Sequence, residues 1–476
     1  MKHADSLAVA RTRGTLLLQG RVYFVHDSVQ FRTQRATWNK SSEVVQCDGY
    51  FRLNHPSGYI NANTGVYQKK QGLATATGNV HAGDSAHSYY FTGEHLIYDR
   101  EKEILTMPQK PVLYQFEKNK EGGEDTVKVV ARRIVYNKKD SFAEAHDQVV
   151  ITQKEVTIAA NHINYDRSKD YAAARDSVTL VHKDITISAD VMNYNRKDDY
   201  AEAFNHVKLV QNDMVVTCDT GYFNHGAGWL SMKGNPAFDM KNYHLTGDSI
   251  FLVLDSAGKT MKSALVIRNA HGIQQEEAKR NAPGSVTEAF GDTLYAEFDG
   301  NKIERLYVNL NARGFFYETD LKDFRNLMDG DRLDLYFNKG KMDKAIVSGK
   351  AQSTYFYVKK DRSVSGKNEA TGDTIHILFD AQKNAVKSLK LLGNSAMASG
   401  RYVDMDKERR NKERAEKESL AKAAAQKELE RDKAALAKGD STKIDSDSFA
   451  SKNVLRRVEE LRKAQKLKKE NTEKNK

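Results

Sequence analysis

Residues 127–242 read VKVVARRIVYNKKDSFAEAHDQVVITQKE, VTIAANHINYDRSKDYAAARDSVTLVHKD, ITISADVMNYNRKDDYAEAFNHVKLVQND and MVVTCDTGYFNHGAGWLSMKGNPAFDMKN, four blocks of 29 residues that align without a gap. A constant period of this length indicates stacked supersecondary units, none of which can bury its apolar face without a neighbour on either side. The repeat therefore decides the fold of the chain.

Apolar and polar residues alternate inside each block, which is the two-residue period of a half-buried strand. In the second block the alternation runs through Val156, Ile158 and Ala160, slips by one residue, and resumes at Ile163 and Tyr165. Such a slip predicts a bulge or bend that turns the strand while one face stays inward. Each unit is therefore predicted to contain two or more short strands that share one apolar face.

The repeat extends in weaker form over most of the chain. A small residue followed five positions later by an aromatic or apolar one marks the bend of about eleven units, which predicts an all-β, elongated, solenoid-like stack of antiparallel strands. The longer unit around residues 117–125 predicts a protruding hairpin loop, and the polar stretch 271–285 predicts a boundary between two stacks. The predicted divisions are a flexible leader (1–13), a first stack (14–273), a second stack (286–403) and a tail (404–476).

The tail differs in composition from the rest of the chain. From Met405 onward helix formers and charges dominate, which predicts a solvated helix, and residues 451–469 predict a second one after a glycine- and serine-containing break. Residues 401–476 carry 23 Lys and Arg against 16 Asp and Glu, so most of the formal charge of +11 lies in this tail. The body is only weakly basic, and no nucleic-acid partner is expected.

Two cysteines, Cys47 and Cys218, fall in columns otherwise filled by small residues, and buried small side chains are favoured there over a disulfide or a metal site. No run approaches the ~20 apolar residues that span a bilayer. The first 20 residues lack the apolar core of ~7–15 residues that a secretory signal needs. No membrane span is therefore expected, and no signal peptide is visible in the chain as given.

Catalytic motifs are not found. An aspartate recurs after the bend of the later units, and we interpret it as a cap of backbone N–H groups in preference to a cation-binding ladder; the positions are Asp190, Asp219, Asp248, Asp292, Asp331 and Asp373. The histidines are scattered, without paired metal-ligand spacing, and there is no nucleophile elbow, phosphate loop or dinucleotide fingerprint. The sequence predicts neither an enzyme nor a bound cofactor or metal.

Small side chains occupy the inward columns on one side of the predicted interior. They are Ala143, Ala145, Ala172, Ala174, Ala201 and Ala203, whereas Val, Ile, Met and Tyr occupy the other inward columns. Rows of small side chains indicate either close packing of the sheet or a lengthwise groove for a long apolar ligand. The columns alone leave these two alternatives open.

The recurring bends ADVMNY, CDTGYF, TGDSIF and FGDTLY, each paired with an A-x-A or G-x-V strand such as ATATGNV, resemble the OstA-like family of lipopolysaccharide-transport proteins, the group of LptA, LptC and the N-terminal domain of LptD. The resemblance covers roughly residues 14–403. It implies a β-jellyroll whose apolar interior shields the acyl chains of lipopolysaccharide in the periplasm. It also implies edge-strand pairing with other jellyroll proteins of the transport bridge, and self-association is a further expectation.

This resemblance implies a non-catalytic lipid carrier of the cell envelope, as a bridge component or as an LptD-like soluble part. The residues then expected to line the groove are Ile134, Tyr136, Ile158, Ile163, Tyr165, Ile187, Met192, Tyr194, Val216 and Phe223. A self-assembling β-solenoid scaffold or filament is the first alternative, and a polysaccharide-active β-helix enzyme is the second. A packed interior favours the scaffold, an open apolar groove the carrier, and a surface cleft with clustered carboxylates the enzyme.

Overall fold

The structure is a computed structural model of the 476-residue chain. It describes residues 1–9, 14–118, 123–224, 226–255, 260–278, 280, 283–300, 302–380, 385–393 and 398–437. The chain divides into two compact units, Met1–Val403 and Asp404–Lys476.

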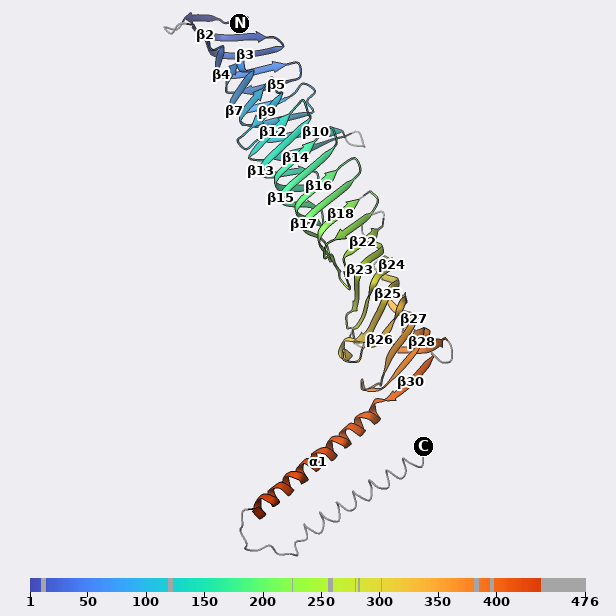
Figure 1. The fold of residues 1–476 in the computed structure, drawn as a ribbon. Helices are drawn as coiled ribbons and strands as arrows, with labels where there is room; N and C mark the ends of the chain where they lie inside the picture. Colours follow the sequence, from blue (N-terminus) through green and yellow to red (C-terminus); the bar gives the residue numbers. More distant parts are fainter. Residues whose placement is uncertain are drawn as a thin grey trace. The chain divides into compact units, whose positions relative to one another are not determined.

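The first unit is a stack in which each long strand pairs antiparallel with the strands before and after it (Figure 1). The β-branched and aromatic residues that alternate with polar ones suit a pleated surface that is buried on one face. Its first strands are β1 (Ser6–Val9), β2 (Thr15–His26), β3 (Val29–Asn39), β4 (Val44–His55), β5 (Gly58–Ala62), β6 (Thr64–Gln68), β7 (Leu73–Asp84), β8 (Tyr89–Asp99) and β9 (Ile104–Met107), with the 3-10 turn η1 (Lys69–Gln71).

The 29-residue blocks correspond to pairs of long strands in the middle of the stack. The block at residues 156–184, for example, contains one complete strand, a hairpin turn and the next strand. These middle strands are β10 (Val112–Lys118), β11 (Glu124–Val130), β12 (Arg133–Asn137), β13 (Phe142–Gln153), β14 (Val156–Asp166), β15 (Tyr171–His182), β16 (Ile185–Asn195), β17 (Tyr200–Gln211) and β18 (Met214–Asn224).

The remaining strands include the longest of the stack, those between residues 261 and 380, in line with the longer spacing of the sequence units there. They are β19 (Trp229–Lys233), β20 (Ala237–Met240), β21 (Tyr243–Thr246), β22 (Ser249–Leu254), β23 (Met261–Glu276), β24 (Ser285–Asp299), β25 (Lys302–Glu318), β26 (Asn326–Asn338), β27 (Lys341–Val358), β28 (Val364–Asp380), β29 (Ala385–Leu392) and β30 (Ser399–Asp404), with the 3-10 turn η2 (Thr319–Leu321).

Long strands bend where the sequence pattern slips. In β15 the bend consists of Asp176 and Ser177, both with positive φ, and the pairing register shifts beside them. Asp and Asn tolerate the left-handed region better than other non-glycine residues, and the bend of β17 begins with Asn205. Earlier strands use glycine instead, for example Gly49 and Gly78. The predicted bends thus contain residues that tolerate the left-handed backbone conformation.

The recurring aspartates lie at these bends, but the contacts recorded for two of them involve side chains. Asp248 accepts hydrogen bonds from Arg268 Nε and Asn269 Nδ2, both at 2.9 Å, and these donors are the bend residues of the next strand. Asp190 is 3.0 Å from the ring of His206, a bend residue of β17. Asp190 and Asp248 therefore join neighbouring bends, whereas the interpretation of the six aspartates as caps of backbone N–H groups stays a prediction.

Each bend folds the sheet over on itself. Trp38 is paired with Leu16, which lies eight residues from Phe24 on β2, or about 26 Å along a straight strand. The ring centroids of Phe24 and Trp38 are nevertheless 5.8 Å apart. The strand halves on the two sides of the bends therefore face each other.

We call these facing halves arm 1 and arm 2. Arm 1 ends at the turns that follow β2, β13, β15 and β17, and arm 2 ends at the turns that follow β3, β14 and β16. Between the arms lies the apolar core, which forms two clusters of buried residues, one from Leu18 to Val178 and one from Ala189 to Phe379. Met192 packs against both clusters. The predicted all-β stack of antiparallel strands, followed by a helical charged segment, is confirmed.

The predicted divisions of the chain can be compared with the strands and the helix of the structure. Residues 6–9, part of the predicted leader, form β1 and pair with β2. Across the polar stretch 271–285, β23 and β24 pair as far as Glu276 and Ser285, and the division into two stacks stays a prediction.

In the second unit, the predicted first helix is α1 (Met405–Ala437), whereas the second predicted helix lies outside the described residues. No helix among the described residues is both long and apolar enough to cross a membrane.

Both cysteines are free and buried, as predicted. Burial raises the pKa of the Cys47 thiol from 9.0 to about 12, and a hydrogen bond with Thr33 opposes the shift. A thiol whose pKa is raised by folding contributes stability below its unfolded pKa, and this contribution disappears as the pH rises from 9 towards 12.

We therefore expect the wild-type free energy of unfolding to fall by about 1.4 kcal/mol more than that of Cys47→Ala between about pH 8 and pH 10. Urea titrations of both proteins at the two pH values measure the difference. Equal losses in the two proteins would show that the Cys47 thiol is not protected by the core.

Candidate functional site

Four rows of inward side chains run along the stack through β12–β18. On arm 2, the rim row alternates bulky and small residues and contains Tyr136, Ala143, Tyr165, Ala172, Tyr194, Ala201 and Phe223. Beside it runs a second row with Ile134, Ala145, Ile163, Ala174, Met192 and Ala203. Because strands lie about 4.8 Å apart, neighbouring aromatic residues of the rim row are separated by about 10 Å, with one alanine between them.

Two aliphatic rows of arm 1 face the two rows of arm 2. Next to the bends lie Val149, Ala160, Val178, Ala189, Val207 and Cys218. The outer row of arm 1 contains Ile151, Ile158, Leu180, Ile187, Leu209 and Val216. All four rows are apolar, apart from the tyrosine hydroxyl groups.

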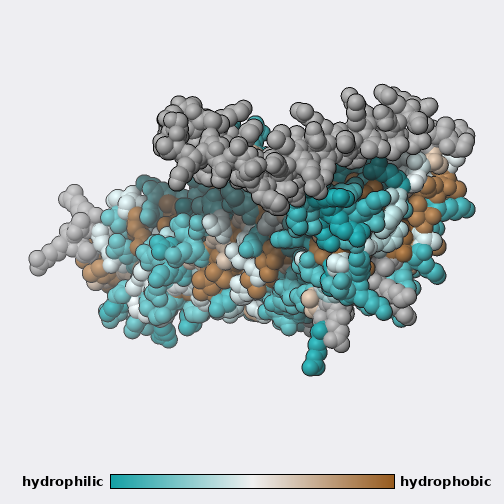
Figure 2. Space-filling view, turned by 90° about the horizontal axis from the view of Figure 1, so that it is seen from below, coloured by the Kyte–Doolittle hydropathy of each residue, from teal (hydrophilic) through white to brown (hydrophobic). Residues whose placement is uncertain are grey.

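Burial decreases from the bends towards the turns in β13–β16, which we call the half-exposed section (residues 142–195). Inward residues beside the bends, such as Ala145 and Val178, are buried. Those farther out, such as Ile158 and Tyr165, are only half-buried, and Tyr194 is 38 % exposed. Apolar inner residues of this section therefore have contact with solvent, and on the face seen in Figure 2 apolar patches lie between hydrophilic ones.

The ten residues predicted to line a groove all lie in these rows. Ile134, Ile163 and Val216 are buried in the packed core. The half-buried ones are Tyr136, Ile158, Tyr165, Ile187, Met192 and Phe223, and Tyr194 is the exposed one. The structure thus brings the predicted residues onto one continuous inner surface, and their role as a groove lining stays a prediction.

Two tyrosines of the rim row hydrogen-bond to their own hairpin turns. Tyr165 Oη donates to Asp170 at 2.9 Å, and Tyr194 Oη donates to Asp199 at 3.1 Å. Burial and then the negative charge of Asp199 raise the pKa of Tyr194 to about 12, so its hydroxyl is neutral at physiological pH. The rings therefore offer an uncharged surface with the hydroxyl groups turned to the rim.

Near the N-terminal end of the stack, side chains join the two arms directly. Phe31 of arm 1 and Tyr67 of arm 2 have ring centroids 5.5 Å apart. Tyr89 and Tyr136, also from opposite arms, are 5.4 Å apart in an edge-on arrangement. The inward residues of β2–β4 are mostly buried, in contrast to those of β13–β16.

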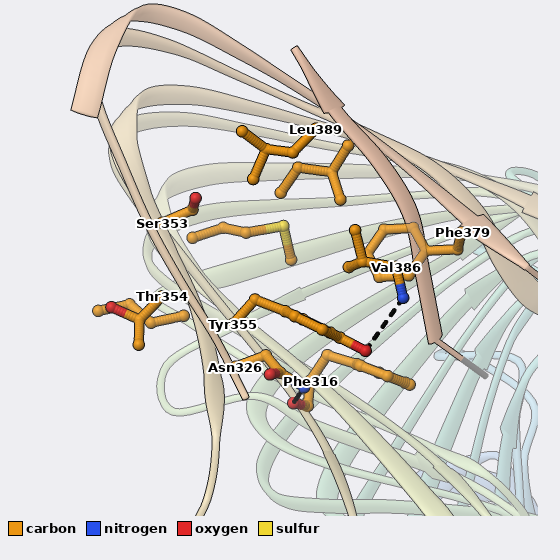
Figure 3. A pocket seen from close by; sticks show the side chains of 11 residues that line it. Phe316, Asn326, Ser353, Thr354, Tyr355, Phe379, Val386 and Leu389 are labelled. Atoms are coloured by element: carbon orange, nitrogen blue, oxygen red, sulfur yellow. Dashed lines mark hydrogen bonds between the residues drawn. The ribbon is translucent and has the colours of Figure 1, made fainter. Parts of the chain in front are cut away.

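Hydrogen bonds join the arms near the other end. Ile303 N donates to Tyr243 Oη at 3.1 Å, and Gln274 Nε2 donates to the Gly340 carbonyl oxygen at 2.9 Å. Val386 N donates to Tyr355 Oη at 3.0 Å, at a small pocket that Phe316, Ser353 and Phe379 also line (Figure 3). The half-exposed section therefore lies between two sections in which the arms are held together.

Sequence periodicity did not reveal these contacts between the arms. It identified the inward face correctly, but partners such as Gln274 and Gly340 lie 66 residues apart and follow no motif. Within the described ranges, no three or more His, Cys, Asp or Glu side chains are placed to hold a metal ion.

Comparisons with known proteins give a family match and a similar solved structure. The family model described as lipopolysaccharide-assembly, LptC-related, matches residues 84–212, from the end of β7 to just beyond β17. LptH of Pseudomonas aeruginosa, described as the LptA homologous periplasmic component of the lipopolysaccharide transport device, is a similar solved structure with 19% identity and a TM-score of 0.24. That match covers 26% of this chain and 94% of LptH. A search of curated proteins finds no match.

The family match includes all four strands of the half-exposed section and most of the inward rows. The resemblance drawn from the repeated bends is therefore confirmed: over residues 84–212 the chain is similar to the LptC-related proteins of lipopolysaccharide assembly.

Proposed function

We propose that the chain is a non-catalytic carrier in the cell envelope, a periplasmic bridge component that moves lipopolysaccharide towards the outer membrane. Its acyl chains would lie against the inward rows of the half-exposed section. The observation that carries this proposal is the decrease in burial across β13–β16, where apolar side chains face the interior and yet remain accessible. The family match to residues 84–212 supports it.

The holding energy in this proposal is hydrophobic. Each methylene removed from water contributes about 0.8 kcal/mol, so ten buried methylenes would contribute on the order of 8 kcal/mol before the entropy cost of ordering the chain. The alanines of the rim row leave space between the tyrosines, which suits a slender acyl chain. Transport itself would require an energy source elsewhere in the envelope, because the burial of acyl chains against this surface would be passive.

Neighbouring proteins would join through the ends of the stack. Among the described strands, β1 has β2 as its one partner, so its other edge carries backbone N–H and C=O groups that another strand can pair with. Leu7 is 51 % exposed and Val9 71 % exposed on this short strand. Pairing with another jellyroll protein of the bridge, or with a second copy of this chain, would cover both.

Site-specific photocrosslinking in envelope-containing cells tests the carrier. A photoreactive residue replaces Tyr165 or Tyr194 in the rim row, and Lys169, in the turn after β14, serves as the control. We expect lipopolysaccharide adducts from the two rim positions and none from the turn, because only the rim residues face the interior.

Two outcomes would contradict the proposal. Adducts of equal yield at Lys169 would show non-specific contact with lipid. Crosslinks between copies of the chain, without lipid at either rim position, would favour the self-assembling scaffold.

A further inference from the structure

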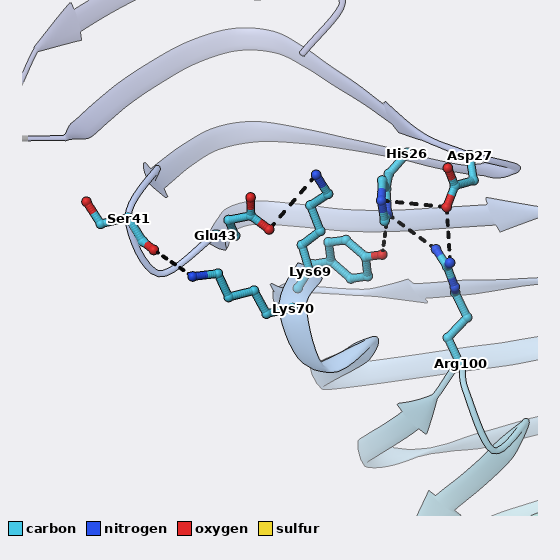
Figure 4. A network of polar contacts seen from close by, with 8 residues as sticks. His26, Asp27, Ser41, Glu43, Lys69, Lys70 and Arg100 are labelled. Carbon is cyan, nitrogen blue, oxygen red and sulfur yellow. Dashed lines mark hydrogen bonds and ion pairs between the residues drawn. The ribbon is translucent and has the colours of Figure 1, made fainter.

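A polar cluster joins the arms at the N-terminal end of the stack (Figure 4). His26 ends β2 and Asp27 follows it, both at the rim of arm 1, whereas Tyr67 and Arg100 belong to arm 2. His26 Nδ1 lies 2.9 Å from Tyr67 Oη and 3.3 Å from Arg100 Nη1, and Arg100 Nη2 lies 3.0 Å from Asp27 Oδ2. Four side chains from three separate parts of the chain thus connect the two rims.

The interior beneath this cluster is closed. Phe24, Phe31 and Phe51 are buried there, and Cys47 of β4 is also buried between the arms. In the half-exposed section, in contrast, the corresponding outer rows are half-buried. The change from closed to accessible interior therefore occurs between the polar cluster and β13.

The ion pair of the cluster is exposed to solvent. Arg100 and Asp27 have side chains that are 34 % and 63 % exposed, and exposed ion pairs contribute only about 0.2–1 kcal/mol and weaken with salt. Tyr67, in contrast, is buried, and burial raises its pKa, as it raises the pKa of Tyr243 and of Tyr355, which accept hydrogen bonds from backbone N–H groups near the C-terminal end. Within the cluster, the exposed Arg100–Asp27 pair is therefore the contact that can break at the lowest cost.

We propose that His26, Asp27, Tyr67 and Arg100 form a latch that holds the arms together over β2–β8 and opens by separation of the rims. When it is closed, the interior of this section is shut. When it opens, the accessible inner surface extends from β13 towards the N-terminal end of the stack. That the opening serves the passage of lipid rests on the proposed function, whereas the latch itself rests on the contacts above.

The alkylation rates of the two native cysteines measure the opening of the latch in the absence of lipid. Cys47 lies beneath it, and Cys218 of β18 lies in the other core cluster and serves as an internal reference. A buried thiol reacts with iodoacetamide only in an open state, so its rate of alkylation is proportional to the population of that state when closing is fast.

The experiment compares alkylation rates in the purified full chain, with each cysteine quantified by mass spectrometry. Arg100→Ala and Asp27→Asn each remove one side of the ion pair, and we expect a rise of about 1.4- to 5-fold in the Cys47 rate with the Cys218 rate unchanged. Lys102→Ala is the matched control, because Lys102 is an exposed cation near Arg100 that pairs with Asp99 of its own arm. High salt should raise the Cys47 rate in the wild type but not in Arg100→Ala.

An unchanged Cys47 rate in both variants would overturn the latch. Equal rises at Cys47 and Cys218 would also overturn it, because they would indicate general destabilisation. Absence of lipid adducts at Tyr165 and Tyr194 would refute the carrier and leave the Cys47 result standing, so the two failures are distinguishable.

Discussion

Replacing Ala172 with tryptophan is expected to lower lipopolysaccharide crosslinking from a photoreactive residue at position 187 by at least tenfold. Ala172 is paired with Tyr165 on one side and Tyr194 on the other, so an indole ring there would fill the space between the two tyrosines. Ile187 lies in the outer row of arm 1, which faces arm 2 across the interior, so a lipid held between the arms would be within reach of a photoreactive residue there. A tenfold loss corresponds to about 1.4 kcal/mol of binding free energy, the order of two lost methylene contacts.

The matched control is Ala173→Trp, one position along the same strand. Successive side chains of a strand point to opposite faces, so this tryptophan lies on the outer face and leaves the interior unchanged. Full adduct yield in Ala173→Trp and loss in Ala172→Trp would place the lipid against the rim row. Full yield in both variants would show that the acyl chains do not use this surface.

Phe51→Ala is expected to destabilise the N-terminal part of the stack by about 3–5 kcal/mol. The Phe51 side chain is fully buried, and a Cβ at Gly65 would overlap its ring, so the ring fills its site completely. Since each strand of a repeat stack contacts mainly its neighbours, the loss should concentrate in β2–β8. Urea unfolding followed by Trp38 fluorescence, in a background with Trp229→Phe, measures this section alone.

Gln46→Ala provides the reference for this measurement. Gln46 is exposed on the same strand, and its removal should change the unfolding free energy by less than about 0.5 kcal/mol. A Phe51→Ala loss as small as that of Gln46→Ala would mean that the aromatic core does not hold this section together. An equal loss in the signal of Trp229, observed in a Trp38→Phe background, would mean that the stack unfolds as one unit.

The repeat allowed most of the fold to be predicted, because bends and strand faces are local properties. The slip after Ala160, for instance, requires a bend at that point whatever the strand packs against, and the structure shifts register there. The charged segment after Met405 forms a helix for equally local reasons, since its residues favour helix and need no partner. These features depend on propensity and periodicity within a few residues.

The candidate site was predictable only in part. Periodicity placed Tyr165 and Ile187 on the inward face, but it could not show how far apart the two arms lie. That separation depends on contacts such as His26 with Tyr67, which are 41 residues apart in the sequence. Alanine columns fit a close-packed sheet and an accessible interior equally well, so the half-burial of the surrounding rows in β13–β16 could not be read from the sequence.

The alternation of aromatic residues and alanine along the rim row repeats every two strands, or about every 10 Å. A long apolar molecule displaced by one such step would meet nearly the same side chains as before. Its energy would then be nearly equal at successive positions, and no single position would trap it. Net movement would require only a small bias at one end, such as a new molecule that enters behind the first.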